Sequence, residues 1–216
     1  ENYYYDSSIT AWRSAGSKTG VNQRTTALEL ADRTTNKSGL VPVVPTSVSV
    51  VSGSASLSGA TVTLAGISSV SLGGVFHSGY SNYEVIFTPT GASGSASVFM
   101  RLSTGTIAAD ANYVYAISGI TTSGTVIAAS STGNTYFYLG DTDTATDRFS
   151  SKATIYSPNN ARRTVASWNG MILSGGAYAG IRGNGFYNLT TQFTGLALVL
   201  SAGTISGTVT VYGYNS

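Results

Sequence analysis

The residues that could do chemistry in this chain are few. The chain has one histidine, His77, no cysteine and nine acidic side chains among 216 residues. Without cysteine there can be no thiol nucleophile, thiolate metal site or disulfide framework. A serine hydrolase would have to use His77, and no Gly-x-Ser-x-Gly elbow accompanies it. We therefore expect a protein that is not an enzyme, with no catalytic residue, and we interpret His77 as a turn residue that makes a local hydrogen bond.

The densest acidic stretch is Asp141-Thr142-Asp143-Thr144-Ala145-Thr146-Asp147. Carboxylates at alternate positions resemble the start of a calcium loop, so Asp141, Asp143 and Asp147 are the metal candidates. The pattern breaks at Ala145, where another ligand would be needed, and no glycine or closing glutamate follows. A solvated loop tip is the ordinary alternative, and we expect no cofactor.

Tyrosine is the more informative residue type, because the chain has 14 tyrosines and only two tryptophans. Outward tyrosines can stack on sugar rings and donate hydrogen bonds to hydroxyl groups at small entropic cost. For each tyrosine, a place in the core or in a subunit interface is the alternative. The candidates for ligand binding are four tyrosines in strand-like segments and two arginines of a loop tip that could meet an anionic glycan, namely Tyr136, Tyr138, Tyr178, Tyr187, Arg162 and Arg163.

The overall composition narrows the class of partner. Charged residues make up 9% of the chain, and the net charge of +2 comes from scattered side chains rather than from a basic stripe. Nucleic-acid binding is therefore disfavoured. No apolar run approaches the roughly 20 residues of a membrane-spanning helix. The hydrophobic fraction of 42% is enough to bury a core.

The elements that must position these side chains are strands. From residue 47 onward, short segments of period 2 alternate with Ser, Gly and Asn turns, which predicts a mainly β head, residues 47–216, built as an antiparallel β-sandwich of jelly-roll type. The predicted strands are Ser47–Val51, Thr61–Ile67, Ser69–Val75, Asn82–Thr88, Ala96–Ser103, Asn112–Ser118, Thr125–Ala129, Thr135–Leu139, Lys152–Tyr156, Thr164–Leu173, Ala177–Tyr187, Gln192–Ser201 and Gly207–Tyr214.

One hairpin is predicted explicitly. Tyr83, Val85 and Phe87 form an apolar row, and a Gly- and Pro-rich turn separates it from a second row that ends in Leu102. Pairing the two strands of this hairpin would bring Glu84 close to Arg101.

The first 46 residues are of a different kind. Residues 1–20 carry three adjacent tyrosines and no period, which indicates an extended aromatic arm that lies against a neighbouring chain or domain. Residues 21–39 form the one helical segment, either a short coiled-coil stem or a lone helix packed on the β domain. Residues 40–46, with Pro42 and Pro45, form an extended linker.

An oligomer would bury several of these surfaces. The residues expected at a self-interface are Val21, Leu28 and Ala31 in the stem and Tyr212 and Tyr214 in the last strand. Because the chain starts at Glu1 rather than Met, we also expect further residues upstream.

Four stretches of the β segment form a recognisable set, namely Ser69-Val70-Ser71-Leu72-Gly73-Gly74-Val75-Phe76, Tyr80-Ser81-Asn82-Tyr83, Val98-Phe99-Met100-Arg101-Leu102 and the closing Gly207-Thr208-Val209-Thr210-Val211-Tyr212-Gly213-Tyr214. Together they resemble a recurring C-terminal β-rich module of bacteriophage minor tail and tail-fibre proteins. The helix and the stretch that follows it also resemble a short fibre coiled coil that leads into such a module.

The resemblance implies a virion protein, a homotrimer whose helical stem presents a β-rich head that touches the host surface or another virion component, and it implies no particular receptor. A host cell-surface glycan is the ligand that the outward tyrosines suggest. A capsid head-fibre or decoration protein is one alternative. A carbohydrate-active enzyme with a β-sandwich fold is the alternative from another class.

Overall fold

A computed structural model describes residues 3–6, 11–14, 39–142, 149–174 and 177–214 of the chain. The chain divides into two units, Glu1–Gly39 and Leu40–Ser216. In the first unit, β1 (Tyr3–Asp6) and β2 (Ala11–Ser14) pair antiparallel, with Tyr5 opposite Trp12. The predicted stem helix, with Val21, Leu28 and Ala31, lies outside the described residues.

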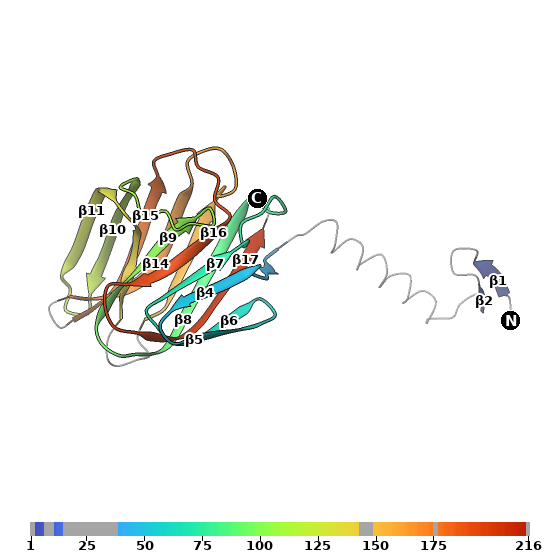
Figure 1. Ribbon diagram of the computed structural model, residues 1–216, viewed down its shortest axis with the longest axis horizontal. Helices are drawn as coiled ribbons and strands as arrows, with labels where there is room; N and C mark the ends of the chain where they lie inside the picture. The colour runs from blue at the N-terminus through green and yellow to red at the C-terminus, as the bar shows by residue number, and fades with distance from the viewer. Residues whose placement is uncertain (1–2, 7–10, 15–38, 143–148, 175–176, 215–216) are drawn as a thin grey trace. The chain divides into compact units, whose positions relative to one another are not determined.

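The second unit is mainly β, as predicted, and its strands form two antiparallel sheets (Figure 1). The large sheet has the order β11-β10-β15-β14-β13-β8-β17-β6-β5, with β3 paired to β17 as well. Its strands are β3 (Val41–Val43), β5 (Ser54–Ser58), β6 (Thr61–Ile67), β8 (Asn82–Ala92), β10 (Tyr113–Thr121), β11 (Val126–Asn134), β13 (Ser151–Tyr156), β14 (Val165–Ser174), β15 (Ala177–Tyr187) and β17 (Ile205–Tyr214).

The small sheet has the order β12-β9-β16-β7-β4. Its strands are β4 (Ser47–Val51), β7 (Ser69–Gly73), β9 (Ala96–Ser103), β12 (Phe137–Thr142) and β16 (Gly195–Leu200). Among the described residues, each strand of this sheet pairs only with members of the same sheet. Strands of the large sheet lie between them in the sequence, so the chain crosses repeatedly from one sheet to the other.

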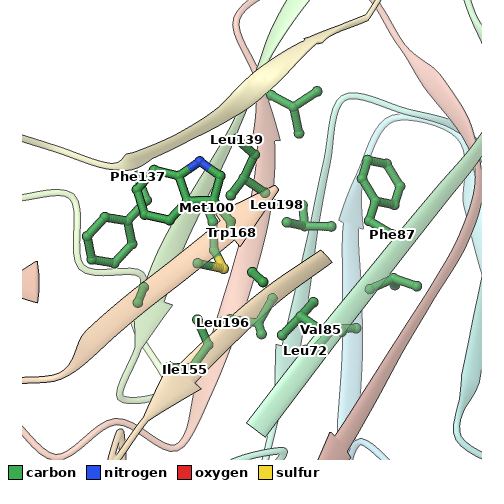
Figure 2. Packing of buried hydrophobic residues seen from close by; sticks show 14 of the residues in the cluster. Leu72, Val85, Phe87, Met100, Phe137, Leu139, Ile155, Trp168, Leu196 and Leu198 are labelled. Atoms are coloured by element: carbon green, nitrogen blue, oxygen red, sulfur yellow. The ribbon is translucent and has the colours of Figure 1, made fainter. Parts of the chain in front are cut away.

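Apolar side chains from both sheets form one core. Leu72, Met100 and Leu198 of the small sheet and Val85 and Trp168 of the large sheet belong to the same buried cluster, as Figure 2 shows. The alternation is clear in β17, where every second residue from Ile205 to Gly213 is buried. Strands with one buried face and one outer face follow from this period of 2, and the outer faces are free to carry polar and aromatic residues.

The predicted hairpin between the two strands around Tyr83 and Leu102 is wrong. β8 pairs with β13 and β17 in the large sheet, whereas β9 pairs with β12 and β16 in the small sheet. The segment between them therefore turns a corner between sheets. Glu84 accordingly pairs with Lys152, at 2.7 Å between Nζ and Oε2, and not with Arg101.

The segment expected to be a linker contributes to the head. Val41–Val43 pairs with β17, with Val43 opposite Val211, and the side chain of Val43 is buried in the core. The chain thus enters the second unit along β17, an inner strand of the large sheet between β8 and β6.

Candidate functional site

An aromatic cluster lies on the outer face of the small sheet. In β9, Val98 and Met100 point into the core, so Phe99 between them points outward. The ring of Tyr136 stacks on Phe99, with centroids 3.8 Å apart and planes 22° from parallel. Tyr138, opposite Phe99 in the β12–β9 register, places its ring centroid 6.3 Å from that of Phe99. The predicted ligand residues Tyr136 and Tyr138 are therefore brought together.

Polar groups border this cluster on both sides. Arg101, two residues along the same outer face, donates from Nε to the carbonyl oxygen of Thr135 at 3.0 Å. On the other side, the hydroxyl of Ser97 donates to Oδ1 of Asp141 at 2.8 Å. The guanidinium and the carboxylate are thus both held by neighbours, which fixes their positions relative to the rings.

The environment of the cluster also changes the pKa of the Tyr138 phenol. Burial, and then the hydrogen bond with the Asp141 carboxylate, raise the pKa of the Tyr138 phenol well above its ordinary value. The phenol therefore stays protonated, and a hydrogen-bond donor, at alkaline pH values at which an ordinary tyrosine would ionise.

A polar hollow of about 240 Å³ opens beside the aromatic cluster. Its lining consists mainly of hydroxyl groups and one carboxylate, from Ser95, Ala96, Ser97, Asp141, Thr142 and Ser201. Asp141 and Ser97 belong both to the hollow and to the border of the cluster. Flat aromatic faces next to fixed hydroxyl and carboxylate groups match the two kinds of surface that a saccharide presents, namely apolar C–H faces and a rim of hydroxyls.

A second, more apolar surface lies on the outer face of the large sheet around Phe186 of β15. A hollow of about 420 Å³ opens there, lined among others by Val114, Val165, Asn184 and Phe186. The guanidinium of Arg163 lies over the Phe186 ring, 5.7 Å from its centroid. Two predicted ligand residues therefore belong to different surfaces, because Arg163 is at Phe186 and Tyr138 is on the small sheet.

The remaining predicted ligand residues are dispersed. Tyr178 is half-buried near the start of β15. Arg162 is exposed and donates from its guanidinium to the hydroxyl of Ser157. Tyr187 is only 2% exposed, so its ring packs in the core and offers no stacking platform. Its hydroxyl donates to Oδ2 of Asp110 at 2.6 Å.

Tyr212 and Tyr214, expected at a self-interface, are half-buried and alternate with the core residues of β17, so they lie on the outer face of the large sheet. Burial, followed by the neighbouring Tyr156 and Glu84, raises the pKa of Tyr214. This position leaves both rings accessible from outside the head.

The residues considered for catalysis and for metal binding are His77 and three aspartates of one acidic stretch. His77 accepts a hydrogen bond at Nδ1 from the backbone N–H of Gly79, at 3.1 Å, which confirms the local turn contact. Within the described residues, no group of three or more His, Asp or Glu side chains is close enough to hold a metal ion. Asp141 is described, whereas Asp143 and Asp147 lie outside the described residues.

Sequence reasoning missed two members of the aromatic surface, Phe99 and Arg101. The signal was present, because the alternation of Val98, Met100 and Leu102 as inward residues leaves the residues between them on the outer face. Their proximity to Tyr136 depends on the β12–β9 register, which the pattern of one strand does not specify.

Comparisons with known proteins add no relative. No family model matches the chain, and neither the curated proteins nor the solved structures yield a match.

Proposed function

We propose that this chain is a virion adhesion protein whose β-rich head binds a saccharide on the host surface through the Phe99 cluster. The observation that carries the proposal is the stacked pair of Phe99 and Tyr136 beside the hollow that contains Asp141 and Ser97. Rings provide the stacking surface, and the fixed carboxylate and hydroxyls select the orientation of the sugar.

The wider assignment follows the resemblance in the sequence. The chain would be a phage tail-fibre or minor tail protein, a homotrimer on the surface of the virion, with residues 1–20 in contact with other virion proteins. The two sheets that share one core are consistent with the antiparallel sandwich of jelly-roll type expected for such a head. Three copies would turn weak contacts with single sugars into strong attachment through multivalency.

A binding role fits the carboxylates described in the second unit better than a catalytic role does. Glu84 is paired with Lys152, Asp110 accepts from Tyr187, and Asp141 accepts from Ser97. Glycoside cleavage needs two carboxyl groups facing one bond, and these three acids lie against different partners. In the described part of the chain, no helix is long and apolar enough to cross a membrane.

The test is saccharide binding by the full chain. After an array of bacterial surface saccharides has identified a ligand, Tyr136→Ala is expected to weaken binding at least about tenfold, as measured by titration calorimetry, because it removes an aromatic anchor. The matched control is Tyr156→Ala on the outer face of the large sheet, where the side chain is 39% exposed.

Equal affinities for the two variants and the unchanged chain would refute the assignment of the site. Tail and capsid placement are separated by another measurement, immunogold labelling of intact particles with an antibody against the head. Label on the capsid shell would favour the head-fibre alternative.

A further inference from the structure

The small sheet carries two charged side chains, Arg101 and Asp141. No other residue of its strands β4, β7, β9, β12 and β16 is charged. Both side chains are half-buried and border the Phe99 cluster, because Asp141 lies opposite Ser97 and Arg101 is further along β9. At ~3.4 Å per residue, the positions of Ser97 and Arg101 on β9 are about 14 Å apart. The cluster therefore has a positive end and a negative end.

The guanidinium of Arg101 is only partly used by the protein itself. Its Nε donates to the carbonyl oxygen of Thr135 at 3.0 Å, and its Nη2 contacts the Thr135 hydroxyl at 3.5 Å. Since a guanidinium has five N–H donors in a planar fork, three of them have no partner in the part of the chain that the structure describes. Thr135 occupies the edge that carries Nε, so the edge formed by Nη1 and Nη2 remains. That edge matches the two oxygens of a carboxylate.

The charge of Arg101 also lacks a counter-ion. Among the described residues, the one ion pair joins Glu84 and Lys152 of the large sheet. Asp141 is at the other end of the cluster, where it accepts from the hydroxyl of Ser97. A fixed guanidinium beside aromatic rings, with its charge not yet neutralised, is suited to an anionic group on a ligand.

We propose that the Phe99 cluster binds an acidic oligosaccharide, with the carboxylate of one sugar at Arg101 and the hydroxyls of a neutral neighbouring sugar at Asp141. This inference rests on the proposed function, because it names the class of saccharide for the same site. The stacked rings of Phe99 and Tyr136 lie between the two ends and contact the C–H faces of the sugars. One sugar ring is too short to reach both ends, so the ligand contains at least two sugars.

The charges decide which sugar lies at which end. A carboxylate carries one negative charge, which one guanidinium can compensate. A phosphate monoester carries about −1.5 to −2 at pH 7, and the small sheet offers it a single cation. A second carboxylate near Asp141 would be repelled, whereas a hydroxyl can donate to the oxygens of Asp141. The sequence of an acidic sugar and a neutral sugar therefore fits the site in one direction only.

The test compares each acidic saccharide with its carboxyl-reduced form, in which a primary alcohol replaces the carboxylate and the linkages are unchanged. Acidic ligands of the full chain, identified on the array of bacterial surface saccharides, are reduced and titrated by calorimetry. Reduction is expected to weaken binding at least about tenfold, because it removes a charge-assisted contact with two hydrogen bonds.

Variants of Arg101 locate the contact. In Arg101→Gln, the acidic saccharide and its reduced form are expected to bind equally. This ratio is measured within one protein, so a general loss of affinity does not imitate it. Arg101→Lys keeps the charge but loses the planar fork, and we expect it to retain part of the preference. The matched control is Arg182→Gln, which removes an exposed cation from β15 of the large sheet and should leave the tenfold preference unchanged.

The outcomes separate the class of ligand from the site. Equal binding of both forms by the unchanged chain would overturn the acidic class, and so would a set of ligands that are all neutral. The proposed function would survive both results if Tyr136→Ala still weakened binding. A preference that persists in Arg101→Gln would also overturn the contact. The absence of any saccharide ligand, or binding that Tyr136→Ala leaves unchanged, would overturn both proposals.

Discussion

At the scale of single residues, Tyr113 shows how this core accommodates phenol groups. The side chain is fully buried, and its ring packs against Phe137 and Tyr187. Its hydroxyl donates to the carbonyl of Ala108 at 2.9 Å and accepts from the backbone N–H of Leu102 at 2.9 Å. One side chain therefore ties the end of β9 to the loop that leads into β10.

Removing this hydroxyl should destabilise the head. Tyr113→Phe is expected to lower the free energy of unfolding by about 1–3 kcal/mol, because the buried N–H of Leu102 loses its acceptor. Urea unfolding followed by fluorescence measures the change. The control, Tyr156→Phe on the outer face, should change the free energy by less than about 0.5 kcal/mol. Similar effects of the two substitutions would contradict the assignment.

The exposure of individual tyrosines was only partly predictable. Tyr136 and Tyr138 flank Phe137, and the alternation places both on the face opposite that buried ring. Tyr178 and Tyr187 were grouped as ligand residues, although they are nine residues apart in a continuous strand and must face opposite sides. Applying the period of 2 across the whole of β15 would have assigned Tyr187 to the core.

At the scale of elements, two glycines permit close approach between the sheets. A Cβ on Gly170 of β14 would lie 2.0 Å from the carbonyl oxygen of Leu139 in β12. A Cβ on Gly140 of β12 would lie 2.2 Å from the carbonyl oxygen of Met171 in β14. The backbones of β12 and β14 therefore approach each other directly at these two glycines. In most β-sandwiches, side chains of the core separate the two sheets.

Gly170→Ala tests this approach. The added methyl group would push the two strands apart, and we expect a loss of about 1–3 kcal/mol in the free energy of unfolding. Gly180→Ala is the matched control, since it lies in the neighbouring strand with no atom within 4 Å of the added Cβ. Denaturant unfolding of both variants decides the matter, and equal stabilities would show that the sheets adjust without cost.

Strand positions were easier to predict than strand partners. Ser47–Val51, Thr61–Ile67, Ala96–Ser103 and Ala177–Tyr187 occur with the bounds that periodicity predicted. β5 was missed, because Ser54-Ala55-Ser56-Leu57-Ser58 carries only weak alternation and follows a turn. The β8–β9 hairpin was wrong because an apolar row says which face is buried and not which strand lies alongside it.

At the scale of the whole molecule, buried phenols predict how the head responds to alkali. Burial and the hydrogen bond to Asp110 raise the pKa of Tyr187 to about 12, and burial raises the pKa values of Tyr83, Tyr113 and Tyr138 as well. A folded-state pKa above the unfolded value of 10.0 means that the contribution to stability is complete below pH 10.

The free energy of unfolding should therefore stay level up to about pH 10 and then fall, with Tyr187 contributing a loss of up to about 1.4 kcal/mol per pH unit until about pH 12. Denaturant titrations at a series of pH values measure the slope, and the near-ultraviolet absorbance of phenolate reports ionisation. Ionisation of every tyrosine near pH 10 without loss of structure would refute the explanation.

The arrangement of the whole head exceeds what the sequence could reveal. Composition and periodicity predicted a β-rich unit with little charge, and this is what the second unit is. The order of the strands depends on contacts between residues far apart in the chain, and those contacts are decided by the fit of side chains across the core.

The position of β17 determines when its neighbouring strands can complete their pairing during synthesis. Residues 205–214 lie between β8 and β6 and also hold β3, so strands made early have no neighbour on that side until this late segment has emerged from the ribosome. Until then, one edge of β8 and one edge of β6 stay unpaired in the nascent chain. A premature stop before the codon for Ile205 would release a product in which those edges stay unpaired, and we expect that product to precipitate.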